Sequence, residues 1–268
     1  MNSDGKGYSH IGRITSSIRH RRYLRSIYLL NNLYDGPEVV DTFFDEGSRI
    51  LVISPHQDDE IIGCGGTLKI LVDRGAQITV AYLTDGGSGS HEIPYQEQID
   101  IREQEAKAGL EILGIGEMIF LRRPDYDLIH NKDTVKEVED LIDEINPDII
   151  FVPYFLDTHP DHAIAAKILG LALSSYSKDL NCYSYEVWTP LPPTIIVDIS
   201  SVMNMKIQAL QQHESQLHNL DYIEKIRGLN AYRSIYADGT TYCEAFMVHS
   251  RSEFIRMLDI NSRKKLRI

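Results

Sequence analysis

The sequence predicts an α/β protein of the Rossmann-like type, a mostly parallel sheet with helices on both faces. Short apolar, β-branched runs alternate with segments of helical periodicity from residue 49 to residue 154. Such alternation favours a parallel sheet built with right-handed crossovers. Acidic and histidine side chains directly follow two of the apolar runs. In an open α/β sheet this is the position at which ligands collect.

Strands and helices are expected in turn through the first part of the chain. The apolar runs at 50–53 and 77–84 have the continuous character of buried parallel strands. Similar runs predict strands at 117–121 and 148–154, and helical periodicity predicts helices at 59–73, 96–113 and 133–145. Gly114 marks the end of the second helix, and Pro147 follows the third.

The second part of the chain is less regular and indicates a smaller elaboration of the same domain. The elements expected there are a helix at 160–174, strands at 182–188 and 194–199, a helix near 202–214 and a last strand at 243–248. We therefore expect one main domain at 46–250. It is preceded by a basic extension at 1–45, helical and either docked or mobile, and followed by a basic tail at 251–268.

Composition places the chain among soluble proteins of a reducing compartment. It has 268 residues, 43% of them hydrophobic and 25% charged, as is usual for globular domains. Its three cysteines are far apart and odd in number, which does not suggest a disulfide framework. No apolar run approaches the roughly 18 residues of a membrane span, and no secretory signal is evident. A cytoplasmic location without a transmembrane span is expected.

Charge is distributed unevenly along the chain. The net charge is −12, yet residues 1–34 hold six basic residues against one acidic residue, a net +5 that leaves −17 for the remainder. So acidic a body would repel phosphate backbones, which excludes nucleic acid as an expected partner. The basic segment 11–33 could dock on the acidic domain or on a second subunit of a homo-oligomer. It could also make weak peripheral membrane contact or serve as a transit peptide.

The first cluster of chemically active side chains follows the strand at 50–53. His56, Asp58, Asp59 and Glu60 come within seven residues of its end. His56 and Asp59 are about one helical turn apart and could bind one metal ion, which leaves Asp58 free to act as a base. An acidic helix N-terminus is the alternative. It accounts for one or two acids but not for three acids with a histidine.

The second cluster follows the strand at 148–154. His159 and His162 are again three residues apart, and His162 could complete a metal site with His56 and Asp59. Two imidazoles and one carboxylate form an open, catalytic type of zinc site, and the same set also suits Fe²⁺. Taken alone, the cluster could be an ordinary turn and helix start with a proline near its first position.

Together these motifs resemble a known family. Pro55-His-Gln-Asp-Asp-Glu60, Gly63-Cys-Gly-Gly-Thr67 and His159-Pro-Asp-His162 resemble the LmbE-like, or PIG-L, family of zinc-dependent de-N-acetylases. That family includes N-acetylglucosaminyl-phosphatidylinositol deacetylases and the deacetylases and amidases of small-thiol and antibiotic biosynthesis. The resemblance covers about residues 49–250, with weaker family-like stretches at 102–106, 206–216 and 244–246.

The resemblance implies roles for individual residues. His56, Asp59 and His162 resemble the zinc ligands, and Asp58 resembles the general base. His159 resembles a second histidine that, when protonated, would stabilise the oxyanion of the reaction. Asp161 resembles the carboxylate that orients His159. Asp157 departs from the tyrosine that some members carry at this position, which puts a tyrosine-assisted oxyanion hole in doubt.

Three further residues have less certain roles. Arg102 resembles a substrate-contacting arginine, and the alternative is a surface salt bridge. Asp85 either lines the substrate crevice or caps the glycine-rich turn that follows its strand. Glu60 is expected behind the metal ligands, where it would accept a hydrogen bond from a backbone amide.

The expected function is removal of an N-acetyl group from an N-acetylated amino sugar or glycoconjugate by a zinc-dependent hydrolase. The alternative is an amidase that cleaves a larger N-acyl conjugate with the same site. A dinucleotide-binding dehydrogenase is disfavoured because the glycines at 63–66 lie behind the acidic cluster, which would repel a pyrophosphate. A catalytically silent sugar-binding module is disfavoured because Asp58 and all three expected ligands are present.

Overall fold

The computed structural model describes residues 36–40, 46–89, 92–217 and 221–258. The chain divides into two compact units, Met1–Pro37 and Glu38–Ile268, and the elements below belong to the second. The basic segment 11–33 lies outside the described residues, so its docking or membrane contact stays a prediction. Among the described helices, none has the length and hydropathy needed to cross a bilayer.

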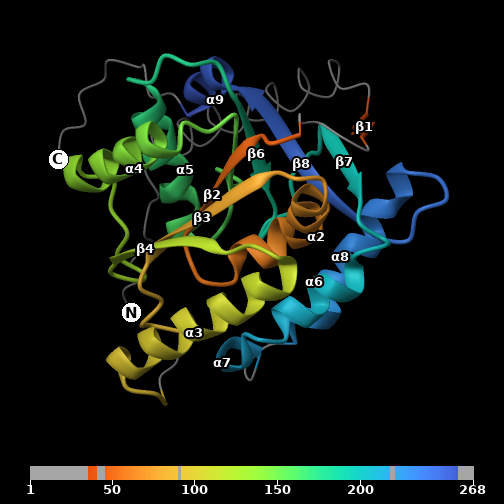
Figure 1. Cartoon of the computed structure of the whole chain (residues 1–268), viewed down its shortest axis with the longest axis horizontal. Coiled ribbons are helices and arrows are strands. Elements are labelled where there is room, and N and C mark those ends of the chain that lie inside the picture. The colour runs from red at the N-terminus through yellow and green to blue at the C-terminus, as the bar shows by residue number, and fades with distance from the viewer. Residues whose placement is uncertain (1–35, 41–45, 90–91, 218–220, 259–268) are drawn as a thin grey trace, which may run out of the picture. The chain divides into compact units, whose positions relative to one another are not determined.

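One sheet of eight described strands organises the second unit (Figure 1). Its spatial order is β1-β7-β8-β6-β5-β2-β3-β4. Neighbouring strands pair in parallel except β8, which runs antiparallel to β6 and β7. This confirms the mostly parallel sheet. The strands are β1 Glu38–Val39, β2 Arg49–Ser54, β3 Gln77–Thr84, β4 Glu117–Arg123, β5 Ile149–Pro153, β6 Asn181–Tyr185, β7 Ile195–Asp198 and β8 Cys243–Ser250.

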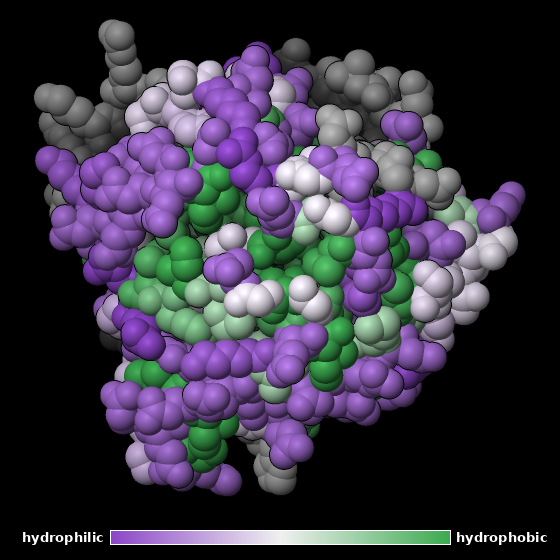
Figure 2. All heavy atoms as spheres, in the orientation of Figure 1, coloured by the Kyte–Doolittle hydropathy of each residue, from purple (hydrophilic) through white to green (hydrophobic). Residues whose placement is uncertain are grey.

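Helices cover both faces of the sheet, as Figure 1 shows. One face carries α4, α5 and α9, and the other carries α2, α3, α6 and α8. The helices are α2 Asp59–Asp73, α3 Tyr95–Leu113, α4 Lys132–Ile145, α5 Pro160–Leu173, α6 Met203–Leu210, α7 Glu214–Leu217, α8 Tyr222–Arg233 and α9 Arg251–Met257, with a 3₁₀ turn η1 at Ser234–Tyr236. In Figure 2, hydrophilic side chains cover α3 and α4, and hydrophobic ones gather over the edge strand β4.

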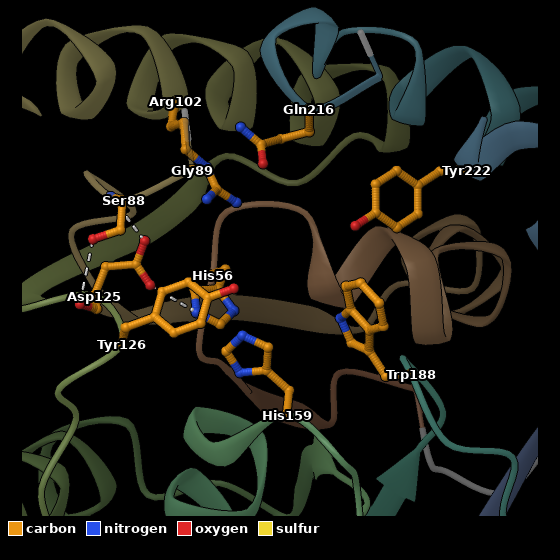
Figure 3. A pocket seen from close by; sticks show the side chains of 10 residues that line it. All are labelled: His56, Ser88, Gly89, Arg102, Asp125, Tyr126, His159, Trp188, Gln216 and Tyr222. Carbon is orange, nitrogen blue, oxygen red and sulfur yellow. Dashed lines mark hydrogen bonds and ion pairs between the residues drawn. The ribbon is translucent and has the colours of Figure 1, made fainter. Parts of the chain in front are cut away.

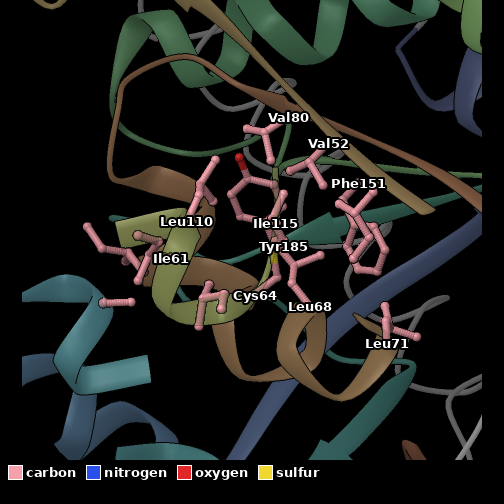
Figure 4. Packing of buried hydrophobic residues seen from close by; sticks show 14 of the residues in the cluster. Val52, Ile61, Cys64, Leu68, Leu71, Val80, Leu110, Ile115, Phe151 and Tyr185 are labelled. Atoms are coloured by element: carbon pink, nitrogen blue, oxygen red, sulfur yellow. The ribbon is translucent and has the colours of Figure 1, made fainter. Parts of the chain in front are cut away.

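Strand β2 shows why its sequence is apolar without interruption. Ile50 and Val52 belong to the core on the α2 face, whereas Leu51 and Ile53 belong to the core on the α5 face. A strand buried on both faces cannot alternate between apolar and polar residues. Figure 4 shows the first of these cores, in which Val52 and α2 side chains such as Leu68 pack together.

The predicted strands and helices are present, with ends that differ by a few residues. The sequence did not indicate α8, because its buried residues are Ile226, Asn230 and Arg233, and a partly polar buried face gives little hydrophobic periodicity. It also did not indicate α9, which begins with a capping box between Ser250 and Glu253. These residues fall in the predicted basic tail, and Phe254 of α9 is fully buried.

Helix α2 passes very close to the end of β6 at Gly63. A Cβ atom there would overlap the Tyr185 ring and lie 2.7 Å from the Glu186 carbonyl oxygen. We expect Gly63→Ala to lower the free energy of unfolding by about 1–3 kcal/mol through overpacking. Chemical denaturation measures this. Gly228→Ala, in a helix with open space around the new methyl group, is the matched control and should be neutral or stabilising. Equal effects at both positions would contradict the close approach.

Candidate active site

The ends of β2 and β5 bring the two predicted clusters together. These strands are parallel neighbours, so the residues that follow them meet at one edge of the sheet. Asp59 Oδ2 lies 3.0 Å from His56 Nδ1 and 3.2 Å from His162 Nε2, and these two nitrogens are 3.4 Å apart. Tetrahedral ligands at 2.0–2.1 Å from a zinc ion are about 3.3 Å from one another. The three donor atoms therefore fit one metal ion.

The outer ring nitrogens of both histidines face carboxylates. His56 Nε2 lies 3.1 Å from Asp125 Oδ1 and 3.3 Å from Asp161 Oδ2, and His162 Nδ1 lies 3.2 Å from Asp157 Oδ1. A carboxylate behind a histidine holds the proton on the outer nitrogen and leaves the lone pair of the inner nitrogen for a metal. His56 Nε2 makes such a hydrogen bond with Asp161. The Asp157 carboxylate lies within ion-pair distance of His162 Nδ1, so the residues present fit a metal cofactor.

The charge of the site also favours a cation. Five aspartates and one arginine are buried within it, Asp58, Asp59, Asp125, Asp157, Asp161 and Arg102. Buried carboxylates are costly unless positive charge compensates them. Two other sets also have donor atoms within 4.8 Å of one another and could hold a metal ion, His56 with His159 and His162, and His56 with Asp125 and Asp161. In the set of His56, Asp59 and His162 all three separations are 3.4 Å or less.

Asp58 lies beside this set at the start of α2. Among the described residues its side chain makes no capping hydrogen bond to the helix, so the carboxylate is not engaged by the backbone there. Arg102 donates from Nη2 to Asp58 Oδ1 at 3.0 Å. Burial raises the pKa of Asp58, while the nearby Arg102 opposes that rise. A carboxylate with a raised pKa is suited to accept a proton near neutral pH.

His159 lies in the pocket above the three donors, with its ring stacked on that of His162 at 4.6 Å. The Asp161 backbone N–H donates to His159 Nδ1 at 3.3 Å, which requires that Nδ1 carries no proton. Burial lowers the pKa of His159. The structure thus favours a neutral ring with its proton on Nε2, instead of the protonated ring expected from the sequence.

The Asp161 carboxylate does not orient His159, the role that the resemblance implied. Its carboxylate faces His56 and also accepts the Tyr126 backbone N–H at 3.0 Å. Only its backbone N–H reaches the His159 ring. The reason is helical geometry, because residues two apart at the start of α5 point in different directions. Asp161 therefore orients the ring of the predicted ligand His56.

Asp85 caps the glycine-rich turn and does not line the substrate crevice. Its carboxylate accepts the Gly87 N–H at 3.0 Å, the Asp125 N–H at 3.3 Å and the Tyr95 hydroxyl at 2.9 Å. These bonds fix the loop after β3. The pocket lining found among the described residues does not include Asp85, so the predicted substrate contact is not supported.

Arg102 and Glu60 are both buried. Arg102 is 3% exposed, so the alternative of a surface salt bridge is wrong, and its guanidinium also lines the pocket. Glu60 accepts hydrogen bonds from the hydroxyl groups of Tyr82 and Ser54 at 2.5 Å and 2.9 Å. Burial raises the pKa of Glu60 to about 8. These hydrogen bonds join Glu60, at the start of α2, to the end of β2 and to β3.

A pocket of about 320 Å³ opens above these residues (Figure 3). It is lined by His56, Ser88, Gly89, Arg102, Asp125, Tyr126, His159, Trp188, Gln216 and Tyr222. Sequence reasoning did not name Asp125, although it follows β4 at the same edge of the sheet as His56 follows β2. Trp188 and Tyr222 come from distant segments without a metal-type motif, so the sequence offered no signal for them.

Comparison with known proteins places this chain in a family. Residues 51–173 match the family model PIG-L, described as GlcNAc-PI de-N-acetylase. Diacetylchitobiose deacetylase of Thermococcus kodakarensis is 33% identical over 192 residues, which cover 65% of this chain and 72% of that protein. The chain belongs to the PIG-L family. This confirms the resemblance inferred from the motifs.

Two further similar proteins agree with this assignment. A probable N-acetyl-α-D-glucosaminyl L-malate deacetylase of Bacillus cereus is 32% identical over 63% of this chain and 83% of that protein. The structure of N,N'-diacetylchitobiose deacetylase from Pyrococcus horikoshii, in complex with an inhibitor, aligns with a TM-score of 0.68. Its sequence identity is 25%, over 75% of this chain and 84% of that one. The fold and the enzyme class, a de-N-acetylase of the PIG-L family, are thereby confirmed.

Proposed function

We propose that this protein is a metal-dependent hydrolase that removes the N-acetyl group from a saccharide or glycoconjugate containing N-acetylglucosamine. The observation that carries the proposal is the convergence of His56 Nδ1, Asp59 Oδ2 and His162 Nε2, with a carboxylate behind each histidine. The names of its relatives, diacetylchitobiose deacetylase and N-acetylglucosaminyl malate deacetylase, support the substrate class.

His56, Asp59 and His162 would hold the metal ion. Two imidazole nitrogens and one carboxylate favour zinc, and the same set is compatible with Fe²⁺. When bound, such an ion polarises an amide carbonyl and lowers the pKa of water to about 7.

Asp58 acts as the general base in this proposal. The Arg102 guanidinium binds Asp58 Oδ1, which leaves the second carboxylate oxygen to take a proton from the attacking water. Once it holds that proton, the carboxyl group can give it to the departing amine. Water adds to the amide carbon, the C–N bond breaks, and acetate and the free amino sugar result.

His159 donates a hydrogen bond in the same reaction. Its Nδ1 is occupied by the Asp161 N–H, so Nε2–H is the group it can offer to the carbonyl oxygen as negative charge develops there. A preorganised donor in a site with little water is worth several kcal/mol of transition-state stabilisation. A neutral imidazole supplies this donor without a further buried charge.

Acetate release from a panel of N-acetylated compounds tests the proposal. The panel should hold N-acetylglucosamine, N,N'-diacetylchitobiose and a glucosamine conjugate with a larger acyl group. We expect acetate and a new primary amine from at least one N-acetyl substrate. Release of the larger acyl group without any acetate would favour the amidase alternative, and no amide cleavage at all would contradict the proposal.

A further inference from the structure

One wall of the pocket carries an exposed tryptophan. Trp188 is the only tryptophan of the chain, and 52% of it is exposed at the pocket rim. Burying an aromatic ring of this size releases considerable free energy. Exposed apolar side chains within a rim of polar groups are typical of ligand-binding grooves. Trp188 is therefore placed where a ligand in the pocket would cover it.

Trp188 and Tyr222 form a corner on one side of the pocket. Their ring centroids are 6.3 Å apart and the rings are nearly perpendicular, at 89°. The Trp188 ring lies 6.4 Å from that of His159, at 35°. Figure 3 shows Trp188 and Tyr222 on the side of His56 and His159 opposite to Tyr126. A flat aromatic face is thus presented next to the site of the proposed reaction.

The position of Trp188 is fixed by the site itself. Asp157 Oδ2 accepts the backbone N–H groups of Trp188 and Thr189, each at 3.0 Å. The other oxygen of the same carboxylate lies 3.2 Å from Nδ1 of His162. Asp157 therefore holds the loop of Trp188 and a predicted metal ligand in one arrangement. A binding surface that is already ordered loses little entropy when its ligand arrives.

The chemistry of this corner suits the C–H face of a sugar ring. The reaction end of the pocket holds polar groups of His56, Arg102 and Asp125 beside the Tyr126 ring, and the Trp188 side offers a second aromatic face. A pyranose has hydroxyl groups around its edge and C–H groups on its faces, so it can stack on such a ring. A pocket of about 320 Å³ is at the lower end of the range for small-molecule sites. A second ring would extend to the rim.

We infer that Trp188, with Tyr222 beside it, is a stacking subsite for the sugar unit adjacent to the one that carries the reacting N-acetyl group. This inference rests on the proposed function and narrows its substrate to compounds with at least two linked sugar rings. It makes Trp188 a determinant of substrate length, with Asp157 as its positioning residue.

Trp188 fluorescence tests the inference directly, because the chain has no other tryptophan. The zinc-loaded Asp58→Asn variant should be titrated with N,N'-diacetylchitobiose and with N-acetylglucosamine, so that the ligand is not consumed. We expect a saturable emission change with the two-ring ligand, at a Kd about tenfold or more below that of the single sugar. An unchanged emission at saturation, or equal affinity for both ligands, would overturn the subsite.

Calorimetry on substituted proteins supplies the second readout. Trp188→Ala should weaken binding of the two-ring ligand about tenfold and change that of the single sugar little, while Trp188→Phe should retain most of the affinity. Tyr232→Ala is the matched control, since Tyr232 is 58% exposed but is not among the pocket-lining residues. If Trp188→Ala weakened the binding of an aryl N-acetylglucosaminide but not that of the disaccharide, the assignment of Trp188 to a sugar ring would be overturned.

Acetate release separates the inference from the proposed function. If the wild-type enzyme released acetate from both sugars with equal kcat/KM, and Trp188→Ala left both values unchanged, the subsite would be refuted and the proposed function would stand. Stacking on Trp188 without acetate release by the wild-type enzyme would support the subsite and refute the proposed reaction.

Discussion

Replacement of Asp58 by asparagine should lower kcat for acetate release by a factor of about 10²–10⁴. The amide cannot take the proton from the attacking water, but it has the same shape and can still accept the hydrogen bond from Arg102 Nη2. We therefore expect metal content and thermal stability to stay close to those of the wild type. Initial rates measured together with bound metal would show whether only the chemical step is lost.

A matched control is available for this substitution. Asp127→Asn removes the same charge from an exposed loop residue near the site and should leave kcat unchanged. If the Asp58→Asn enzyme turned over within about tenfold of the wild type, Asp58 would not be the base.

The second large effect is expected at a buried ion pair that does not line the pocket. Lys206 and Glu244 have fully buried side chains, and Lys206 Nζ donates to Glu244 Oε1 at 2.6 Å. Lys206 Nζ also donates to the Ile62 carbonyl at 2.8 Å and to Asn230 Oδ1 at 3.0 Å. Glu244 in turn accepts a backbone N–H from α2, that of Thr67, at 2.7 Å. The pair therefore joins α2, α6, α8 and β8.

Lys206→Met should destabilise the protein by about 3–5 kcal/mol, because it leaves the Glu244 carboxylate buried without its cation. For a domain of this size that corresponds to a fall in Tm on the order of 6–20 °C. Lys206→Met combined with Glu244→Gln should recover part of the loss, since no uncompensated charge then remains. Scanning calorimetry measures both.

Lys136→Met is the control for this comparison. Lys136 is paired with Asp140 on the surface of α4, with 62% of each side chain exposed, and such pairs contribute little to stability. A Lys206→Met protein as stable as the Lys136→Met protein would show that the buried pair does not hold the four elements together.

Much of the fold could be predicted because its strands are buried on both faces. The continuous apolar run of β2 and the following cluster at His56 are local features, and each is visible in about ten residues of sequence. The antiparallel direction of β8 depends on how distant segments pair, and α8 buries Asn230 and Arg233 rather than a stripe of apolar residues. Neither property leaves a periodic signal.

The candidate site, too, could be predicted only in part from the sequence. His56, Asp59 and His162 were predicted as one set because the ends of two parallel strands can converge on one crevice and because their motifs resemble those of a known family. The partners of these residues could not be assigned from spacing alone. Asp161 turns to His56 and not to His159, and Asp157 supports His162 and the Trp188 loop together. Such contacts are fixed by side-chain direction and loop path, which three-residue motifs do not encode. The oligomeric state and the cytoplasmic location stay predictions.

The most direct test of the central claim is metal content measured together with acetate release, before and after chelation and on return of zinc or Fe²⁺. The site predicts one equivalent of metal per chain, loss of both metal and activity on chelation, and recovery of both on return. His56→Ala and His162→Ala proteins should remain folded yet fail to recover. Acetate release that persists in a protein shown to be free of metal would contradict the account.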